Sequence, residues 1–141
     1  MSQAPLSCVL LADRHHGLTE SVRGMLATAF GTVVMVADET SLLEAADRLR
    51  PEVAVVDLSL AQHSALDWLR SMRQRCPDVK VVALSVHDEE TVRRAAMEAG
   101  ADAFVLKRAV ATDLLAAIAL VRGGGEKGTT SARSEPGSKQ T

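Results

Sequence analysis

The segment VAVVD at residues 53–57 decides the fold of this 141-residue chain. Four apolar residues follow one another with no polar residue between them, and three of the four are β-branched valines. A strand with one face in water alternates apolar with polar residues, whereas a strand covered on both faces does not. The segment therefore predicts a central strand of a parallel sheet, and Asp57 marks the point where that strand ends.

Four further apolar runs and a set of helical patterns surround this strand. The five predicted strands start 21 to 26 residues apart, and the four further runs cover residues 6–11, 32–37, 79–85 and 103–107. The helical patterns cover residues 18–30, 41–50, 65–75, 88–99 and 112–122. Five strand–helix units with right-handed crossovers predict an α/β fold. We expect an open, doubly wound parallel sheet in the order 2-1-3-4-5 with helices on both faces.

Local signals mark the ends of two of these helices. Ser41 and Glu44 have the spacing of a capping box, which is expected to open the second helix. Asp88 is the predicted N-cap of the fourth helix, and Gly100 is well placed to follow its last turn in a left-handed conformation.

The composition excludes several classes of protein. Apolar residues make up 47% of the chain, which is too many for a disordered protein. The net charge of −2 means that basic and acidic residues nearly balance, whereas nonspecific nucleic-acid binding needs a basic surface. No signal peptide and no apolar stretch of membrane-spanning length is present, so we expect a cytoplasmic protein. Cys8 and Cys76 lack any paired spacing and are predicted to be buried thiols.

Polar residues follow four of the predicted strands. Asp13 and Arg14 follow the first, Asp57 ends the third, Ser85 ends the fourth and Lys107 ends the fifth. These four strands are neighbours in the predicted sheet, so their ends should converge on one pocket. Two carboxylates, a hydroxyl and two cations suit the reversible phosphorylation of a carboxylate. Asp57 is the candidate nucleophile, with Lys107 and Ser85 contacting phosphoryl oxygens.

Simpler interpretations exist for each residue alone. A single Asp after a strand is usually a turn or cap residue, and a single Lys there is usually solvated. The spacing of all four residues over successive units is what favours a site. His15, His16 and His63 lie near the same edge but have no spacing typical of metal ligands, so we interpret them as loop residues.

On these residues the chain resembles the receiver domain of bacterial two-component response regulators, from about residue 6 to residue 122. The resemblance rests on four stretches: VLLAD at 9–13, VAVVD at 53–57, LSVHDE at 84–89 and AGADAFVLK at 99–107. The third stretch is similar to receivers that are usually fused to helix-turn-helix output domains. The resemblance implies a flavodoxin-like fold and a non-enzymatic phosphorelay protein, which receives its phosphoryl group from a histidine kinase or a histidine phosphotransfer protein.

The resemblance also implies roles for individual residues. Asp57 would be the phosphoacceptor and Lys107 the lysine of the family pattern. Ser85 would be the switch hydroxyl and Phe104 the switch aromatic residue. Asp13 would belong to an acidic pair that binds Mg²⁺, together with Asp57 and the backbone carbonyl of Ser59.

Two departures from the family pattern put the metal in doubt. Arg14 stands where the family usually has a second acid, and the loop LAQHSA at 60–65 lacks the usual Pro and Gly. A cation about 6 Å from Mg²⁺ would repel it by about 5 kcal/mol before screening at an effective dielectric constant near 20. Either Arg14 takes over part of the metal's role, or an Arg14–Asp57 pair holds a phosphorylation-independent pseudo-receiver in one state. An unrelated enzyme on the same fold is a third reading, but no nucleophile elbow, Gly-rich phosphate loop or dinucleotide fingerprint is present.

The domain prediction is a receiver over residues 1–122 and a flexible tail over residues 123–141. The tail is rich in Gly, Ser, Thr and Lys and is too short for a helix-turn-helix domain. We therefore expect no direct DNA binding and no membrane contact, and an output through a downstream protein partner. By resemblance, the face formed by the fourth helix, fifth strand and fifth helix is a candidate homodimer surface.

Overall fold

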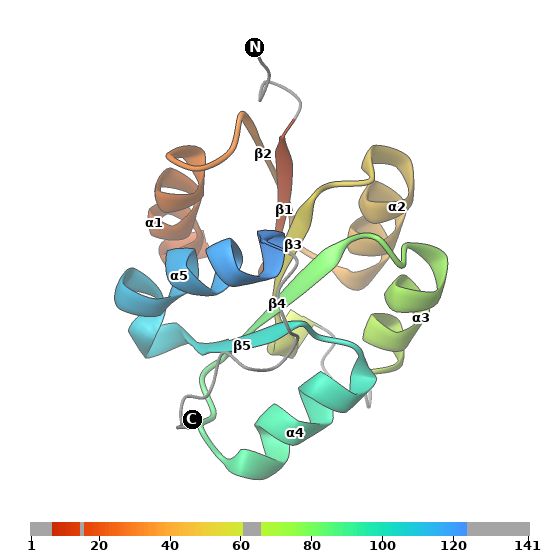
Figure 1. The fold of residues 1–141 in the computed structure, drawn as a ribbon, viewed down its shortest axis with the longest axis vertical. Helices are drawn as coiled ribbons and strands as arrows, with labels where there is room; N and C mark the ends of the chain where they lie inside the picture. Colours follow the sequence, from red (N-terminus) through yellow and green to blue (C-terminus); the bar gives the residue numbers. More distant parts are fainter. Residues whose placement is uncertain (1–6, 15, 61–65, 124–141) are drawn as a thin grey trace.

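A computed structural model describes residues 7–14, 16–60 and 66–123 (Figure 1). The predicted tail from residue 124 onward, His15, His63 and most of the 60–65 loop lie outside the described residues.

The described residues form one parallel sheet of five strands in the order β2-β1-β3-β4-β5. The strands are β1 (Cys8–Ala12), β2 (Thr32–Val36), β3 (Val53–Asp57), β4 (Lys80–Ser85) and β5 (Ala103–Leu106). The helices are α1 (His16–Ala27), α2 (Glu39–Leu49), α3 (Asp67–Arg75), α4 (Glu90–Ala99) and α5 (Val110–Arg122), with short 3-10 turns η2 (Leu58–Leu60) and η3 (Lys107–Ala109). The predicted fold class and strand order are confirmed.

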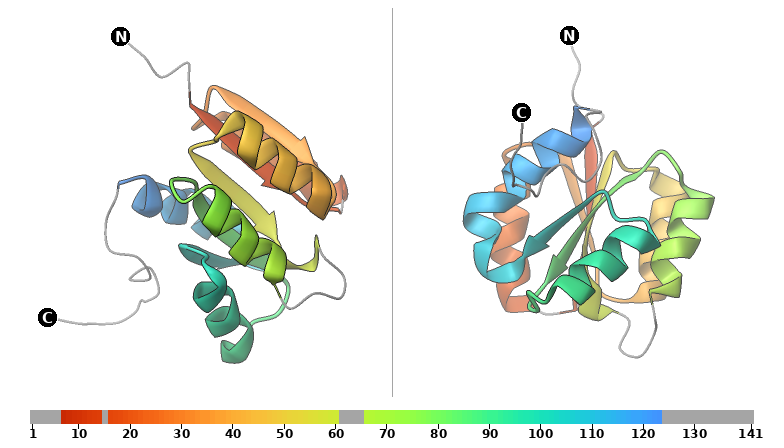
Figure 2. Two further views of the ribbon diagram at one scale, coloured as in Figure 1. Left: turned by 90° about the vertical axis from the view of Figure 1, so that its right-hand side faces the viewer. Right: turned by 60° about the horizontal axis from the view of Figure 1, so that its bottom comes forward.

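Helices cover both faces of the sheet and create two apolar cores (Figure 2). On β3, Val53 and Val55 face the core beneath α1 and α5, whereas Ala54 and Val56 face the core beneath α2, α3 and α4. Every residue of β3 is buried, which is the reason for its uninterrupted apolar sequence. Trp68, the single tryptophan, is 1% exposed in the second of these cores.

Two predicted helix starts are wrong. Helix α2 begins at Glu39 because the Asp38 side chain caps it, accepting a hydrogen bond of 2.8 Å from the backbone N–H of Ser41. Ser41 therefore lies in the first turn and opens no capping box. Helix α4 begins at Glu90 with Glu89 in the capping position, so Asp88 is not its N-cap.

Three smaller predictions also have an outcome. Gly100 does follow α4 with a φ of +125°, as its position indicated. Cys76 is buried, but Cys8 is only half-buried at the start of β1, where partial burial raises the pKa of its thiol. Within residues 7–14, 16–60 and 66–123, no helix is long and apolar enough to span a bilayer.

Candidate functional site

The candidate site lies at the carboxyl ends of four neighbouring strands. Asp13 follows β1, Asp57 ends β3, Ser85 ends β4 and Lys107 follows β5. The register aligns these ends, because Ala12 pairs with Val56, Asp57 with Leu84, and Ser85 with Leu106. All four polar side chains are buried, none being more than 9% exposed.

Lys107 joins the two carboxylates. Its Nζ lies 2.8 Å from Asp57 Oδ2 and 3.2 Å from Asp13 Oδ2. The backbone turns into η3 immediately after β5, and Lys107 is the first residue of this turn and is buried. The structure thus brings Asp13, Asp57 and Lys107 together at one place, as strand order indicated.

Ser59 adds two contacts that sequence reasoning missed. Its backbone N–H donates to Asp57 Oδ1 at 3.1 Å, and its hydroxyl donates to Asp57 Oδ2 at 2.9 Å. From the sequence, only the backbone carbonyl of Ser59 was expected to take part, as a ligand of Mg²⁺. The available signal was the spacing, since an Asp side chain commonly accepts from the backbone two residues further on.

These contacts keep the Asp57–Lys107 pair ionised. Burial opposes the charged form of Asp57, but hydrogen bonds from Lys107 and Ser59 outweigh it and hold the pKa of the carboxyl below its usual range. Burial likewise opposes the charged form of Lys107. The carboxylates of Asp57 and Asp13 outweigh that effect, so the pKa of Lys107 is raised. Asp57 is therefore a carboxylate, the form needed in a nucleophile.

The Ser85 hydroxyl is occupied by the backbone of the loop after β4. It accepts a hydrogen bond of 2.9 Å from the His87 N–H and donates one of 3.0 Å to the His87 carbonyl. The hydroxyl is therefore hydrogen-bonded within its own loop. Any move toward Asp57 would have to break these bonds.

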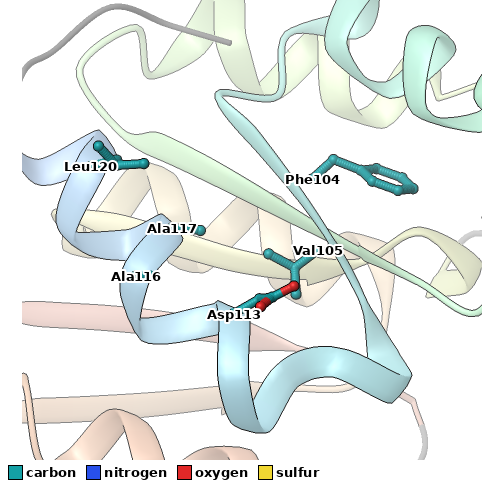
Figure 3. A pocket seen from close by; sticks show the side chains of 6 residues that line it. All are labelled: Phe104, Val105, Asp113, Ala116, Ala117 and Leu120. Atoms are coloured by element: carbon teal, nitrogen blue, oxygen red, sulfur yellow. The ribbon is translucent and has the colours of Figure 1, made fainter. Parts of the chain in front are cut away.

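Phe104 on β5 is half-buried beside a cavity of about 230 Å³ (Figure 3). In Figure 3 its ring points away from α5, whereas Val105 lies close to that helix. The cavity lies between β5 and α5, away from Asp57, and is lined by Phe104, Val105, Asp113, Ala116, Ala117 and Leu120.

The sequence did not predict an ion pair between the two loops beside the candidate site. Arg108 donates to Asp88 at 2.9 Å, so an exposed ion pair joins the loops after β5 and β4. Arg108 lowers the pKa of Asp88. Arg14 is exposed directly after Asp13.

The donor set does not fit a divalent cation. Mg²⁺ requires near-octahedral oxygen ligands, usually with one or two carboxylates. Here the ammonium of Lys107 contacts both carboxylates, and the next residue after Asp13 is a cation. Across the described ranges, no group of three or more His, Cys, Asp or Glu side chains could hold a metal ion.

Comparison with known proteins gives a consistent result. Residues 9–119 match the model of the family described as "Response regulator receiver domain". The chain is 30% identical over 119 residues to the transcriptional regulatory protein DegU of Brevibacillus brevis, which covers 83% of this chain and 50% of that protein. It is 34% identical over 119 residues to the response regulator GacA of Pseudomonas syringae pv. syringae, covering 82% and 55%. The chain thus spans about half the length of these curated relatives.

Solved structures share the fold. A two-component response regulator of the LuxR family from Aurantimonas sp. SI85-9A1 superposes with a TM-score of 0.76 at 24% identity, covering 84% of this chain and 86% of that one. A response regulator from Burkholderia pseudomallei, solved with a phosphorylated aspartic acid, a calcium ion and citrate, has a TM-score of 0.71 at 22% identity, covering 84% and 69%.

Proposed function

Because residues 9–119 match the receiver model, the chain belongs to the response regulator receiver family, and we propose that it accepts a phosphoryl group on Asp57. The observation that carries the proposal is the buried Asp57 carboxylate, which lies 2.8 Å from the ammonium of Lys107. As a signalling module of two-component systems it would turn over no diffusible substrate. We propose a cytoplasmic location for it.

The chemistry is an in-line transfer. A carboxylate oxygen of Asp57 attacks the phosphorus, a P–O bond forms, and the bond between phosphorus and the donor breaks with its electron pair leaving on the donor. The donor would be a phosphohistidine of a histidine kinase or of a phosphotransfer protein. The product is an acyl phosphate, and Lys107 would transfer its hydrogen bond from Asp57 Oδ2 to a phosphoryl oxygen.

The signal would leave the site through Ser85. A phosphoryl oxygen on Asp57 is a stronger acceptor than the His87 carbonyl that now accepts from this hydroxyl. If the hydroxyl turns to the phosphoryl group, the two Ser85–His87 bonds break and the loop between β4 and α4 is released. Phe104, on the neighbouring strand, would repack in response.

The output would be a protein contact. We propose that the face formed by α4, β5 and α5 binds a downstream partner or a second copy of the chain, with no direct DNA contact. Leu120 supports this, because it is 50% exposed on α5. Leu120 also lines the 230 Å³ cavity beside Phe104.

Intact mass spectrometry tests the phosphoacceptor role. Wild type treated with acetyl phosphate or phosphoramidate should gain one adduct of about 80 Da, the mass of a phosphoryl unit. Asp57→Asn should gain none, because the amide lacks the nucleophilic oxygen. Asp102→Asn, which changes another buried carboxyl, should still be labelled if it folds. Absence of the adduct on wild type would rule out the proposal.

A phosphorylation-independent interaction module is the second candidate. It is favoured by Lys107, whose ammonium already contacts both carboxylates, and by the cation at Arg14. Under this alternative, wild type would take up no phosphoryl group, and Asp57→Asn would bind the downstream partner as tightly as wild type.

A further inference from the structure

Asp57 contacts Lys107, which also contacts Asp13, and Arg14 is the exposed residue that follows Asp13 in the chain. The charges of these four residues sum to zero. Asp13 and Asp57 contribute two negative charges, and Lys107 and Arg14 contribute two positive ones. We propose that this site holds its phosphoryl group without a divalent cation, with Lys107 and Arg14 supplying the positive charge. The inference rests on the proposed function of Asp57 as phosphoacceptor and concerns which positive charges stabilise the phosphoryl group there.

Lys107 occupies the carboxylate oxygens that a divalent cation would use. Its Nζ lies 2.8 Å from Asp57 Oδ2 and 3.2 Å from Asp13 Oδ2, and its side chain is 8% exposed. A divalent ion bound through these two Oδ2 atoms would have to displace this ammonium from two short, buried contacts. The ammonium therefore competes with a metal for the Oδ2 atoms of both carboxylates.

Arg14 changes the net charge of the site. A carboxylate at position 14 would make the unphosphorylated site −2 and so attract a dication, whereas Arg14 makes it neutral. On phosphorylation, Asp57 loses its own charge and the phosphoryl group brings two. The site then carries −1 with Arg14, and would carry −3 with a carboxylate there. The guanidinium also suits the geometry of phosphoryl oxygens, because it donates two parallel N–H bonds.

A chelator experiment separates the two proposals. Wild type is labelled with acetyl phosphate in EDTA and in excess Mg²⁺, and the adduct is counted by intact mass. We expect labelling rates within about twofold of each other. Labelling only with Mg²⁺ overturns this inference and leaves the phosphoacceptor role intact. No labelling in either buffer overturns both.

Calorimetric titration with Mg²⁺ gives a readout that needs no phosphorylation. Arg14→Asp should bind Mg²⁺ at least about tenfold more tightly than wild type, because it changes the site by two charges. Arg48→Asp is the matched control, since Arg48 is an exposed residue in the last turn of α2 and makes the same charge change. It should bind Mg²⁺ as wild type does. Equal Mg²⁺ affinity in wild type and Arg14→Asp would overturn the inference.

Discussion

The two ends of the sheet each bury a carboxylate, but they surround it with different partners. At the carboxyl end, Asp57 is 2% exposed and is held by the side chains of Lys107 and Ser59, with a further bond from the Ser59 backbone. At the amino end, Asp102 is 1% exposed between α4 and β5. Its Oδ2 accepts from the Val81 backbone N–H at 2.9 Å.

At the amino end, Asp102 and its partner Arg73 both form hydrogen bonds with backbone groups. Asp102 exchanges a second bond with the same residue, its N–H donating to the Val81 carbonyl at 2.7 Å. Arg73 from α3 approaches Asp102 Oδ2 at 3.4 Å and also donates to the carbonyls of Val79 and Pro77. The register of β4 and β5 fixes these groups in place.

The difference is that strand backbone holds Asp102, whereas Asp57 is held mainly by side chains. The charged partner of Asp57 is a flexible lysine that also contacts Asp13, so it has an alternative acceptor when Asp57 changes. Asp102 has no such substitute, because moving it would break bonds of the sheet itself. A group that is chemically modified, as we propose for Asp57, is better placed where side chains, and not strands, hold it.

The largest expected effect is the loss of stability in Asp102→Ala. Removing this carboxylate leaves the Val81 N–H without its buried acceptor and Arg73 without its carboxylate partner, which should cost about 3 kcal/mol or more. Asp57→Ala should cost about 1 kcal/mol, because Lys107 keeps Asp13. Urea unfolding followed by fluorescence measures both, since Trp68 is buried and the chain has no tyrosine. The comparison fails if Asp57→Ala is the more destabilising change.

A smaller loss is expected in Gly100→Ala. Gly100 has a φ of +125°, and a Cβ there would clash with Cγ of the Arg73 side chain. Backbone strain and displacement of Arg73 together should cost about 2 kcal/mol.

Gly24→Ala is the matched control for that substitution. Gly24 lies within α1, where a Cβ would meet nothing within 4 Å, so alanine should stabilise the helix by about 0.5–1 kcal/mol. Opposite signs at the two glycines would locate the cost at the Arg73 contact and the positive φ. A neutral Gly100→Ala would show that Arg73 is free to move away from Asp102.

Much of the fold could be predicted because it depends on patterns along the chain. The uninterrupted VAVV run placed β3 and its burial, and the residue that follows each strand placed Asp13, Asp57 and Lys107 at one edge. The resulting roles of these residues stay predictions.

Contacts between segments distant in sequence could not be predicted in the same way. Arg73 and Asp102 are 29 residues apart and meet only because α3 packs near the start of β4 and β5. Asp88 carried a valid N-cap signal, but Arg108 across the rim offers it a charged partner and the helix begins two residues later. Local propensity had no information about either competing contact.

The smallest expected effect is a pH dependence confined to the carboxyl end. Because hydrogen bonds from Lys107 and Ser59 lower the pKa of Asp57 below its ordinary 3.8, the unfolded chain takes up a proton there before the folded chain does. Its contribution to stability is therefore full above pH 3.8 and is lost as the pH falls through the folded pKa. Lys107 has a raised pKa, so its contribution is full below 10.5 and is lost only as the pH rises through its folded value.

Urea unfolding of wild type and Asp57→Asn at pH 3, 5, 7 and 9 isolates this dependence. The difference in unfolding free energy between the two proteins should stay constant from pH 5 to pH 9. At pH 3 wild type should lose stability relative to the variant, because asparagine does not titrate. A difference that instead moves in favour of wild type in acid would mean that the folded protein prefers Asp57 protonated. The carboxyl would then be a poor nucleophile, and the contrast with Asp102 would rest on geometry alone.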